Sequence, residues 1–372
     1  MTVKPNDKND SSHLLSFDKR KEHIARIFIR HKDIVHAWEV LQYNFNNGIR
    51  LREASTGYII GHSRCGKSET IKRFIKETTG VEIKTQGDKR DKTDIKLCEG
   101  NDVRLIYADM TNGMTPRIAS NAILKDVFSA LLTATAGESE GARDLIKHFN
   151  KHHINMLLID EAQQMFNGHG PGAALKLGKW LLPLENAASF STVLAGAPEL
   201  ENLHKTVEAA NLRKAGFARL KPFEFSTAMQ KAEFRRFLRQ FAEQLPYSSS
   251  CLLDGDLKFV DELLSPMYYA TRGRRGEIAK LFEQATYFAF KKEDSGGCPT
   301  RLTVDHLAAA FDFNLLNDHR MKGVNPFRAK KEDIPTITKC LTEEKEAEEV
   351  ALRLEAAQQR LRQRHQRNGR GR

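Results

Sequence analysis

Short apolar runs alternate with segments of helical periodicity along the chain between residues 55 and 226. The runs predict buried β-strands, and the segments after them repeat apolar residues at helical spacing. The predicted strands lie at residues 56–60, 103–109, 154–161, 190–195 and 218–225. Such alternation is typical of a parallel sheet with helices on both faces, whose ligands bind at the carboxyl ends of the strands. We therefore predict an α/β fold with a five-stranded parallel sheet.

Beyond residue 227 the pattern changes to helices alone, which predicts a second, all-helical subdomain. Its expected helices lie at residues 228–245, 256–264, 276–291 and 303–311. Between the first two predicted strands, residues 80–101 are hydrophilic and rich in Lys and Asp, so we expect a surface excursion there.

A glycine-rich turn joins the first predicted strand to a helix. From Gly61 to Ser68 its spacing is G-x-x-x-x-G-K-S, that of a phosphate-binding loop whose backbone N–H groups converge on phosphates. In this pattern Lys67 reaches the outer phosphates and the Ser68 hydroxyl ligates magnesium, so we predict that ATP and Mg²⁺ bind here. The residues expected to contact the nucleotide are Gly61, His62, Ser63, Arg64, Cys65, Gly66, Lys67, Ser68 and Glu69.

Two carboxylates end the third predicted strand. In P-loop ATPases the first acid at this place holds the magnesium shell, and a following glutamate accepts a proton from the attacking water. Asp160 and Glu161 are our candidates for these two roles. By themselves they have a simpler interpretation, because acids often mark the end of a strand.

Charge and composition narrow the class of partner and the compartment. The 372-residue chain has a net charge of +11 and a pI near 9.3, which favours a polyanionic partner such as nucleic acid, with solubility as the alternative explanation. Its five cysteines include no C-x-x-C pair, so neither disulfides nor a zinc site is indicated. No apolar run has membrane-spanning length, and we expect a soluble protein of a reducing, cytoplasmic compartment with no membrane partner.

These patterns divide the chain into five expected parts. They are a flexible tail at 1–17, a helical lead-in at 18–54, a nucleotide-binding subdomain at 55–226, a helical lid at 227–316 and a charged extension at 317–372. Within the extension, a charged helix leads into an arginine-rich tail. That helix is either a solvated surface helix or an arm that binds nucleic acid or a protein partner.

The order of these motifs resembles that of the AAA+ ATPases, and in particular the TniB and TnsC proteins, which regulate transposition in Tn7-like and related bacterial transposons. The resemblance covers about residues 29–311. The motifs that carry it lie at residues 29–32, 61–68, 157–163, 193–200 and 271–278. It implies ATP-dependent assembly on double-stranded DNA as a homo-oligomeric ring or helical filament, with a DDE-type transposase and a TniQ-type target-selection adaptor as partners.

The resemblance also implies roles for several basic residues. Arg213 or Arg219 would act in trans on a neighbouring subunit's nucleotide, and ordinary surface positions are the alternative. Arg275, or its neighbour Arg274, would touch the phosphates in cis, although DNA binding and solvation are equally open. For DNA, the candidates that would face a central channel are Arg117 and Lys125, with solvated helix positions as the alternative.

One position departs from the family pattern. At the end of the fourth strand the family usually has a polar residue that senses the γ-phosphate, whereas this chain has Ala197, and Thr192 lies too early in the strand to replace it. Efficient hydrolysis is therefore in question. The alternatives to a transposition regulator are a nucleotide-gated scaffold with little hydrolysis, and a related helicase-loader or secretion-type ATPase.

Overall fold

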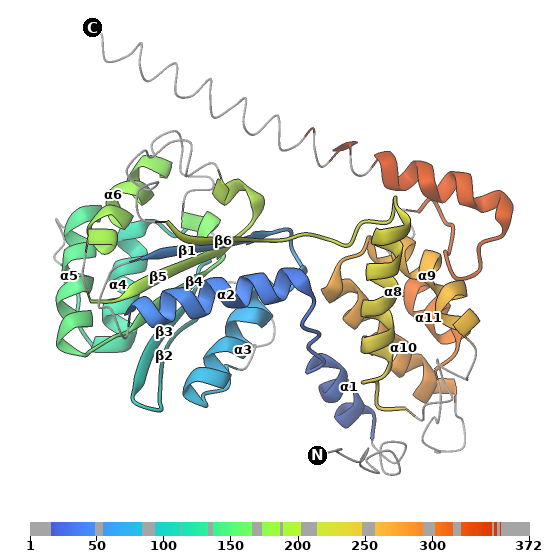
Figure 1. Ribbon diagram of the computed structural model, residues 1–372, viewed down its shortest axis with the longest axis horizontal. Helices are drawn as coiled ribbons and strands as arrows, with labels where there is room; N and C mark the ends of the chain where they lie inside the picture. The colour runs from blue at the N-terminus through green and yellow to red at the C-terminus, as the bar shows by residue number, and fades with distance from the viewer. Residues whose placement is uncertain are drawn as a thin grey trace, which may run out of the picture. The chain divides into compact units, whose positions relative to one another are not determined.

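The computed structural model divides the chain into two compact units (Figure 1). The sheet unit comprises the described residues of Lys32–Lys221, and the helical unit those of Met1–His31 and Pro222–Val350. The residues that the structure describes are 16–48, 55–83, 94–111, 113–132, 137–165, 173–186, 189–201, 214–247, 257–292, 302–314, 321–343, 346–347 and 350. Among them, no helix combines the length and the apolar character needed to cross a bilayer.

The sheet unit contains a six-stranded sheet with the order β2-β3-β4-β5-β1-β6. Its strands are β1 (Thr56–Gly61), β2 (Asp94–Gly100), β3 (Val103–Asp109), β4 (Met156–Asp160), β5 (Ser191–Gly196) and β6 (Lys214–Leu220). In the run β3-β4-β5-β1-β6 every pair of neighbouring strands is parallel, which confirms the predicted five-stranded parallel sheet. The sixth strand, β2, pairs antiparallel with β3 at one edge.

Strand β2 corrects the expectation of a surface excursion for the last part of residues 80–101, while residues 84–93 lie outside the described residues. Asn101 and Asp102 have φ angles of 53° and 59°, which is the left-handed geometry of a tight two-residue hairpin turn. The turn folds β2 back onto β3, with Cys98 opposite Leu105 and buried. The polar composition of β2 reflects its place at the edge of the sheet, where charged side chains remain in contact with water.

The last strand also differs from its prediction. Strand β6 ends at Leu220, whereas the apolar pattern placed a strand at 218–225. The difference arises because Phe223 and Phe225 belong to the helical unit, where their rings pack against Phe234. A single run of apolar residues thus serves two different cores, which periodicity cannot separate.

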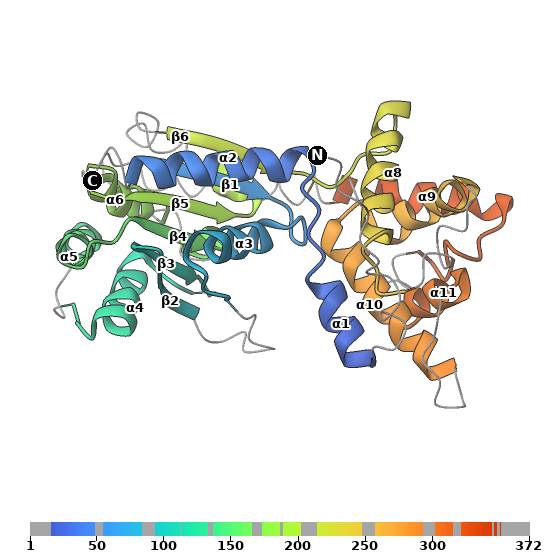
Figure 2. The same ribbon diagram turned by 60° about the horizontal axis from the view of Figure 1, so that its bottom comes forward.

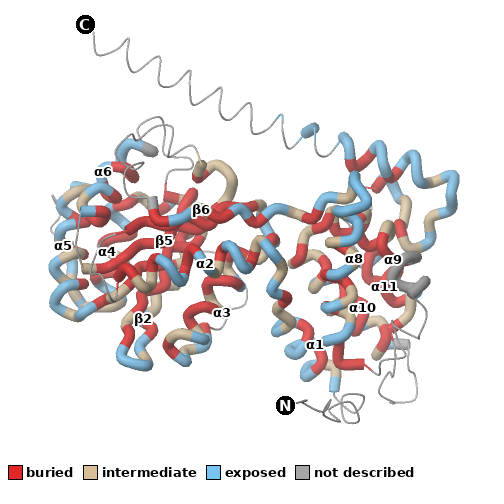
Figure 3. Tube along the Cα trace, in the orientation of Figure 1, coloured by how far each residue is buried: buried red, intermediate tan, exposed pale blue. Residues whose placement is uncertain are grey.

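Helices cover both faces of the sheet (Figures 1 and 2). Helices α2 (Lys32–Asn46) and α3 (Lys67–Thr79) contact β1, and α2 also runs along β6. Strand residues such as Tyr58, Ile106 and Ile159 share a buried core with the helices of the other face. Those helices are α4 (Pro116–Phe128), α5 (Glu138–Lys151) and α6 (Ala173–Asn186). Figure 3 shows the result, a sheet buried between two helical layers.

The helical unit is held together by an aromatic-rich core. Its labelled α-helices are α1 (Phe17–Ala25), α8 (Ala228–Ala242), α9 (Leu257–Thr271), α10 (Arg275–Lys292) and α11 (Val304–Asp312), and residues 334–343 are helical as well. Two of them begin with capping boxes, at Thr227 and Thr303, which satisfy the first N–H groups of α8 and α11. Helix α1 joins this unit through Arg20, whose buried guanidinium lies between the rings of Tyr247 and Phe290.

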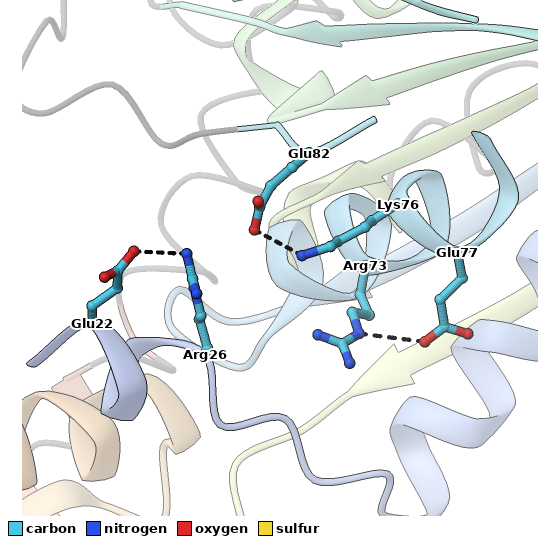
Figure 4. Close-up of polar contacts among 6 residues, drawn as sticks. All are labelled: Glu22, Arg26, Arg73, Lys76, Glu77 and Glu82. Atoms are coloured by element: carbon cyan, nitrogen blue, oxygen red, sulfur yellow. Dashed lines mark hydrogen bonds and ion pairs between the residues drawn. The ribbon is translucent and has the colours of Figure 1, made fainter. Parts of the chain in front are cut away.

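Short 3₁₀ helices among the described residues are η3 (Ala162–Met165), η4 (Pro198–Leu200) and η7 (Lys331–Asp333). Exposed helix faces have ion pairs of the kind shown in Figure 4. On α3 and just beyond it, Arg73 pairs with Glu77 at 3.3 Å and Lys76 pairs with Glu82 at 2.9 Å. Exposed pairs contribute little to stability, at most about 1 kcal/mol each. The fold therefore depends on its buried cores.

A buried asparagine ties α2 to the strands around the predicted phosphate loop. The Asn44 side chain donates to the Ala215 carbonyl oxygen at 2.6 Å and accepts from the Ser55 hydroxyl at 2.8 Å. Gly57 leaves room for it, because a Cβ there would lie 2.4 Å from Asn44 Nδ2. Asn44 thus fixes α2 against the start of β1 and against β6.

We predict that Asn44→Ala lowers the free energy of unfolding by about 2–4 kcal/mol, because it leaves two buried groups without their partner. Chemical denaturation measures this change. The matched control is Gln42→Ala on the exposed face of the same helix. Equal losses in the two variants would contradict the role assigned to Asn44.

Candidate functional site

Strand β1 delivers the glycine-rich loop to the carboxyl edge of the sheet. Gly61 ends the strand, and a Cβ at this position would lie 2.3 Å from the Leu220 carbonyl oxygen of β6. At the other end of the loop Gly66 has a φ of 97°, which favours glycine, and it gives α3 no side-chain cap. The first N–H groups of α3 are therefore suited to an anion, which the positive end of the helix also attracts.

The lysine of the loop is buried and surrounded by its own backbone. Lys67 is 4% exposed, and its Nζ donates to the carbonyl oxygens of Gly61 at 2.8 Å and His62 at 3.1 Å. Two neutral carbonyls balance a buried ammonium group poorly, so an anion beside it is electrostatically favoured. Around it Cys65 is buried, His62, Gly66 and Ser68 are half-buried, and Ser63, Arg64 and Glu69 are exposed.

Asp160 ends the neighbouring strand β4 and is fully buried. Its carboxylate accepts from the Tyr107 hydroxyl at 3.2 Å and from the Glu161 backbone N–H at 3.0 Å. Burial, followed by the Asp160 charge, raises the pKa of Tyr107, which therefore stays a neutral donor. Two hydrogen bonds leave this carboxylate with further lone pairs for a cation.

Asp109 is a member of this site that sequence reasoning missed. It ends β3 directly beside Asp160 in the parallel register, and burial, with the Asp160 charge as the second cause, raises its pKa to about 6. Its position at the end of an apolar strand was the available signal. What the sequence alone did not show is that β3 and β4 are adjacent, which places two carboxylates side by side.

Glu161 follows Asp160 in an unusual backbone conformation. Its φ of 52° lies in the left-handed region, which costs a non-glycine residue about 1–2 kcal/mol. Such strain is concentrated at functional sites. The side chain accepts a hydrogen bond from the Gln163 amide, so the carboxylate has a defined direction. Gln163 is a second residue that the sequence analysis did not single out.

These residues fit ATP with Mg²⁺. The α3 N–H groups and Lys67 provide donors for phosphate oxygens, while the Ser68 hydroxyl and Asp160 carboxylate are the hard oxygen ligands that Mg²⁺ prefers. A magnesium ion would also offset the repulsion between Asp109 and Asp160. Bound ATP supplies the phosphoanhydride bond. The chain provides the donors, the acids and Glu161, whose carboxylate is suited to accept a proton from water.

The predicted trans-acting arginines are only partly described. Arg219 is exposed on β6, where its Nε and Nη2 donate to the two carboxylate oxygens of Glu201 at 2.8 and 3.2 Å. Its guanidinium also lies 4.4 Å from the Phe217 ring centroid. The hydrogen bond to Glu201 raises the pKa of Arg219. Arg213 lies outside the described residues.

The remaining predicted residues are divided between the two units. Arg275 begins α10 of the helical unit, where it donates to His31 Nδ1 at 3.2 Å and lies 4.6 Å from the Phe223 ring centroid. Its neighbour Arg274 is half-buried. The DNA candidates Arg117 and Lys125 are both exposed on α4 in the sheet unit.

Comparisons with known proteins give one matching family model and several similar solved structures. Residues 50–203 match the family model described as AAA domain, and no curated protein matches the sequence. The Orc1 protein of Aeropyrum pernix, solved in complex with DNA, is 15% identical, with a TM-score of 0.54 over 81% of this chain and 71% of that one.

Two further structures are similar. A Walker-type ATPase of Pyrococcus abyssi is 14% identical, with a TM-score of 0.41 over 86% of this chain and 90% of that one. Cdc6p of Pyrobaculum aerophilum is 12% identical, with a TM-score of 0.42 over 87% and 89%. At 15% identity, the likeness to the Orc1 protein is one of fold. The AAA domain match and the Orc1 likeness confirm the predicted fold class, an AAA+ P-loop α/β fold.

The raised pKa of Asp109 predicts a pH dependence of stability. Between its ordinary value of 3.8 and about 6, the folded protein binds more protons at this site than the unfolded chain does. Stability therefore falls as the pH rises through this window. We predict that Asp109→Asn removes this loss. Without divalent cations it should gain on the order of 1 kcal/mol over the wild type at pH 7, with solvent screening allowed for, and nothing near pH 4.

Urea denaturation at several pH values tests this expectation. Asp126→Asn, at an exposed position on α4, is the control and should follow the wild type at every pH. A gain from Asp109→Asn that is the same at pH 4 and pH 7 would show that Asp109 is not the titrating group.

Proposed function

We propose that this protein is an ATP-dependent, DNA-binding AAA+ ATPase that assembles on double-stranded DNA and regulates DNA transposition. The observation that carries the ATPase part is that the phosphate loop after β1 and the acids at the end of β4 lie at the same carboxyl edge of the parallel sheet. This edge has the buried Lys67 at the start of α3, the buried Asp160 at the end of β4 and, directly after it, Glu161 with its constrained backbone.

Each residue of this site has one task in the proposed reaction. Lys67 neutralises charge on the outer phosphates, while Ser68 and Asp160 hold the magnesium shell. Glu161 takes a proton from a water molecule while the water oxygen attacks the γ-phosphorus. The bond between the γ-phosphorus and the β–γ bridging oxygen then breaks, which releases ADP and phosphate. Charge stabilisation and positioning supply most of the acceleration in this class of reaction.

Two features support DNA as the partner. The chain has a net charge of +11, and Arg117 and Lys125 lie exposed on α4, where their positive charges attract phosphate groups. The Orc1 protein, which shares the fold, was solved in complex with DNA. Assembly as a ring or a helical filament would bring an arginine such as Arg219 to a neighbour's nucleotide, after release from Glu201.

The transposition role rests on the sequence resemblance. The motifs at residues 193–200 and 271–278 are those that resemble TniB and TnsC, and a DDE-type transposase and a TniQ-type adaptor are the partners that this role requires. The second candidate is a scaffold that binds ATP but hydrolyses it slowly. Ala197 favours it, because this residue offers no polar side chain at the end of β5. Turnover measured with and without DNA separates the two.

Electron microscopy with linear duplex DNA tests assembly. We expect ordered rings or filaments with ATP and with Glu161→Gln, because this variant binds ATP but lacks the base. Lys67→Ala should give none, since it lacks the phosphate-binding cation. In solution, Glu161→Gln should lower kcat by about 10²–10⁴-fold. DNA that stays bare in every nucleotide state would overturn the DNA part of the proposal, and transposase stimulation by the assembled protein tests the transposition part.

Salt dependence tests the DNA-binding role of α4. Changing Arg117 and Lys125 to Gln should weaken binding alike on all sequences and reduce the slope of log K against log salt by about 1 for each phosphate that is no longer neutralised. Fluorescence anisotropy across a salt series measures both effects. Lys151→Gln, at an exposed position on α5, is the control. An unchanged slope in the double variant would remove α4 from the DNA interface.

A further inference from the structure

The Gln163 side chain forms a bridge between two strand ends of the sheet unit. It lies in η3, two residues beyond Glu161, and is 4% exposed. Its Nε2 donates to the Glu161 carboxylate, and its Oε1 accepts from the Ala197 backbone N–H at 2.9 Å. One amide therefore connects the residue after β4 to the residue after β5.

The chemistry of both partners fixes the orientation of this amide. A carboxylate only accepts hydrogen bonds and a backbone N–H only donates, so the NH₂ group must face Glu161 and the oxygen must face Ala197. Gly196 makes room for the arrangement, since a Cβ there would lie 2.4 Å from Gln163 Oε1. The bridge is therefore specific at both ends.

The bridge acts on the residue that is strained. Glu161 has a left-handed backbone, and its carboxylate needs a defined direction to accept a proton from water. A bond from Gln163 to one carboxylate oxygen holds that direction and leaves the other oxygen for water. The same amide joins the end of β5, where Ala197 contributes only its backbone N–H.

We propose that Gln163 is a positioning residue for ATP hydrolysis, which aims the Glu161 carboxylate and links its aim to the end of β5. It thereby serves in place of the polar side chain that Ala197 does not supply. The inference rests on the ATPase activity proposed above. It predicts that substitution of Gln163 lowers kcat only when Glu161 is present.

The alternative is that Gln163 is a structural brace, which stabilises the fold without positioning Glu161, and it leads to different expectations. Removal of a brace lowers stability, and any cost in rate adds to that of a second substitution elsewhere. Removal of a positioning residue lowers kcat and leaves nucleotide affinity unchanged. In addition, its cost disappears once the group that it positions has been removed.

The experiment compares two substitutions with a matched control. Gln163→Met keeps the length of the side chain without hydrogen bonds, and Gln163→Glu keeps an acceptor for Ala197 but loses the donor to Glu161. Gln164→Met is the control, because the hydrogen bond from Gln164 to Glu161 runs through the backbone. Each is made in the full chain, alone and with Glu161→Gln. Phosphate release, binding of a fluorescent ATP analogue and melting temperature are measured with duplex DNA present.

We expect kcat to fall roughly 10–100-fold in both Gln163 variants, with analogue binding within twofold of the wild type and no further loss in the Glu161→Gln background. Gln164→Met should match the wild type. A wild-type kcat in Gln163→Met, or the same fold-change with and without Glu161, would overturn the inference. Wild-type turnover that is absent, or that Glu161→Gln does not lower, would instead overturn the proposed ATPase. If Gln163→Met lowers the melting temperature, the kcat of Gln163→Glu decides between the two roles.

Discussion

Parallel pairing of the central strands is the constraint on which the site depends. Because β3, β4, β5 and β1 run in the same direction, their carboxyl ends meet at one edge of the sheet. The phosphate loop, the acids after β4 and the backbone after β5 therefore reach the same edge from distant parts of the sequence. Gly61 strengthens the constraint, because only glycine allows β6 to pack so closely beside the start of the loop.

The same convergence has an electrostatic cost. Asp109 and Asp160 end adjacent strands in register, and burial, followed by the Asp160 charge, raises the pKa of Asp109 to about 6. Two carboxylates held together resist ionisation unless a cation joins them. The repulsion between these carboxylates therefore favours a bound cation such as Mg²⁺. The buried positive charge of Lys67 favours phosphate in the same way.

The β5 end shows how a missing side chain is compensated by a neighbouring one. Ala197 has no polar group, but its N–H meets the oxygen of Gln163, whose amide group also holds Glu161. The strained backbone of Glu161 and the small volume of Gly196 both serve this contact. The proposed ATPase therefore has a connected set of polar groups between two strands, without a polar residue at position 197.

The sequence by itself determined the parallel α/β sheet, the phosphate loop and the acids after β4. These features are local, since hydrophobic periodicity and residue spacing within one segment are enough to define them. Only the tertiary structure decided that β2 returns to the sheet edge, that Phe223 packs in the helical core, and that Asp109 and Gln163 join the candidate site. Those outcomes depend on which strands are neighbours and on which side chains meet through space, and neither is encoded in the spacing of a single segment.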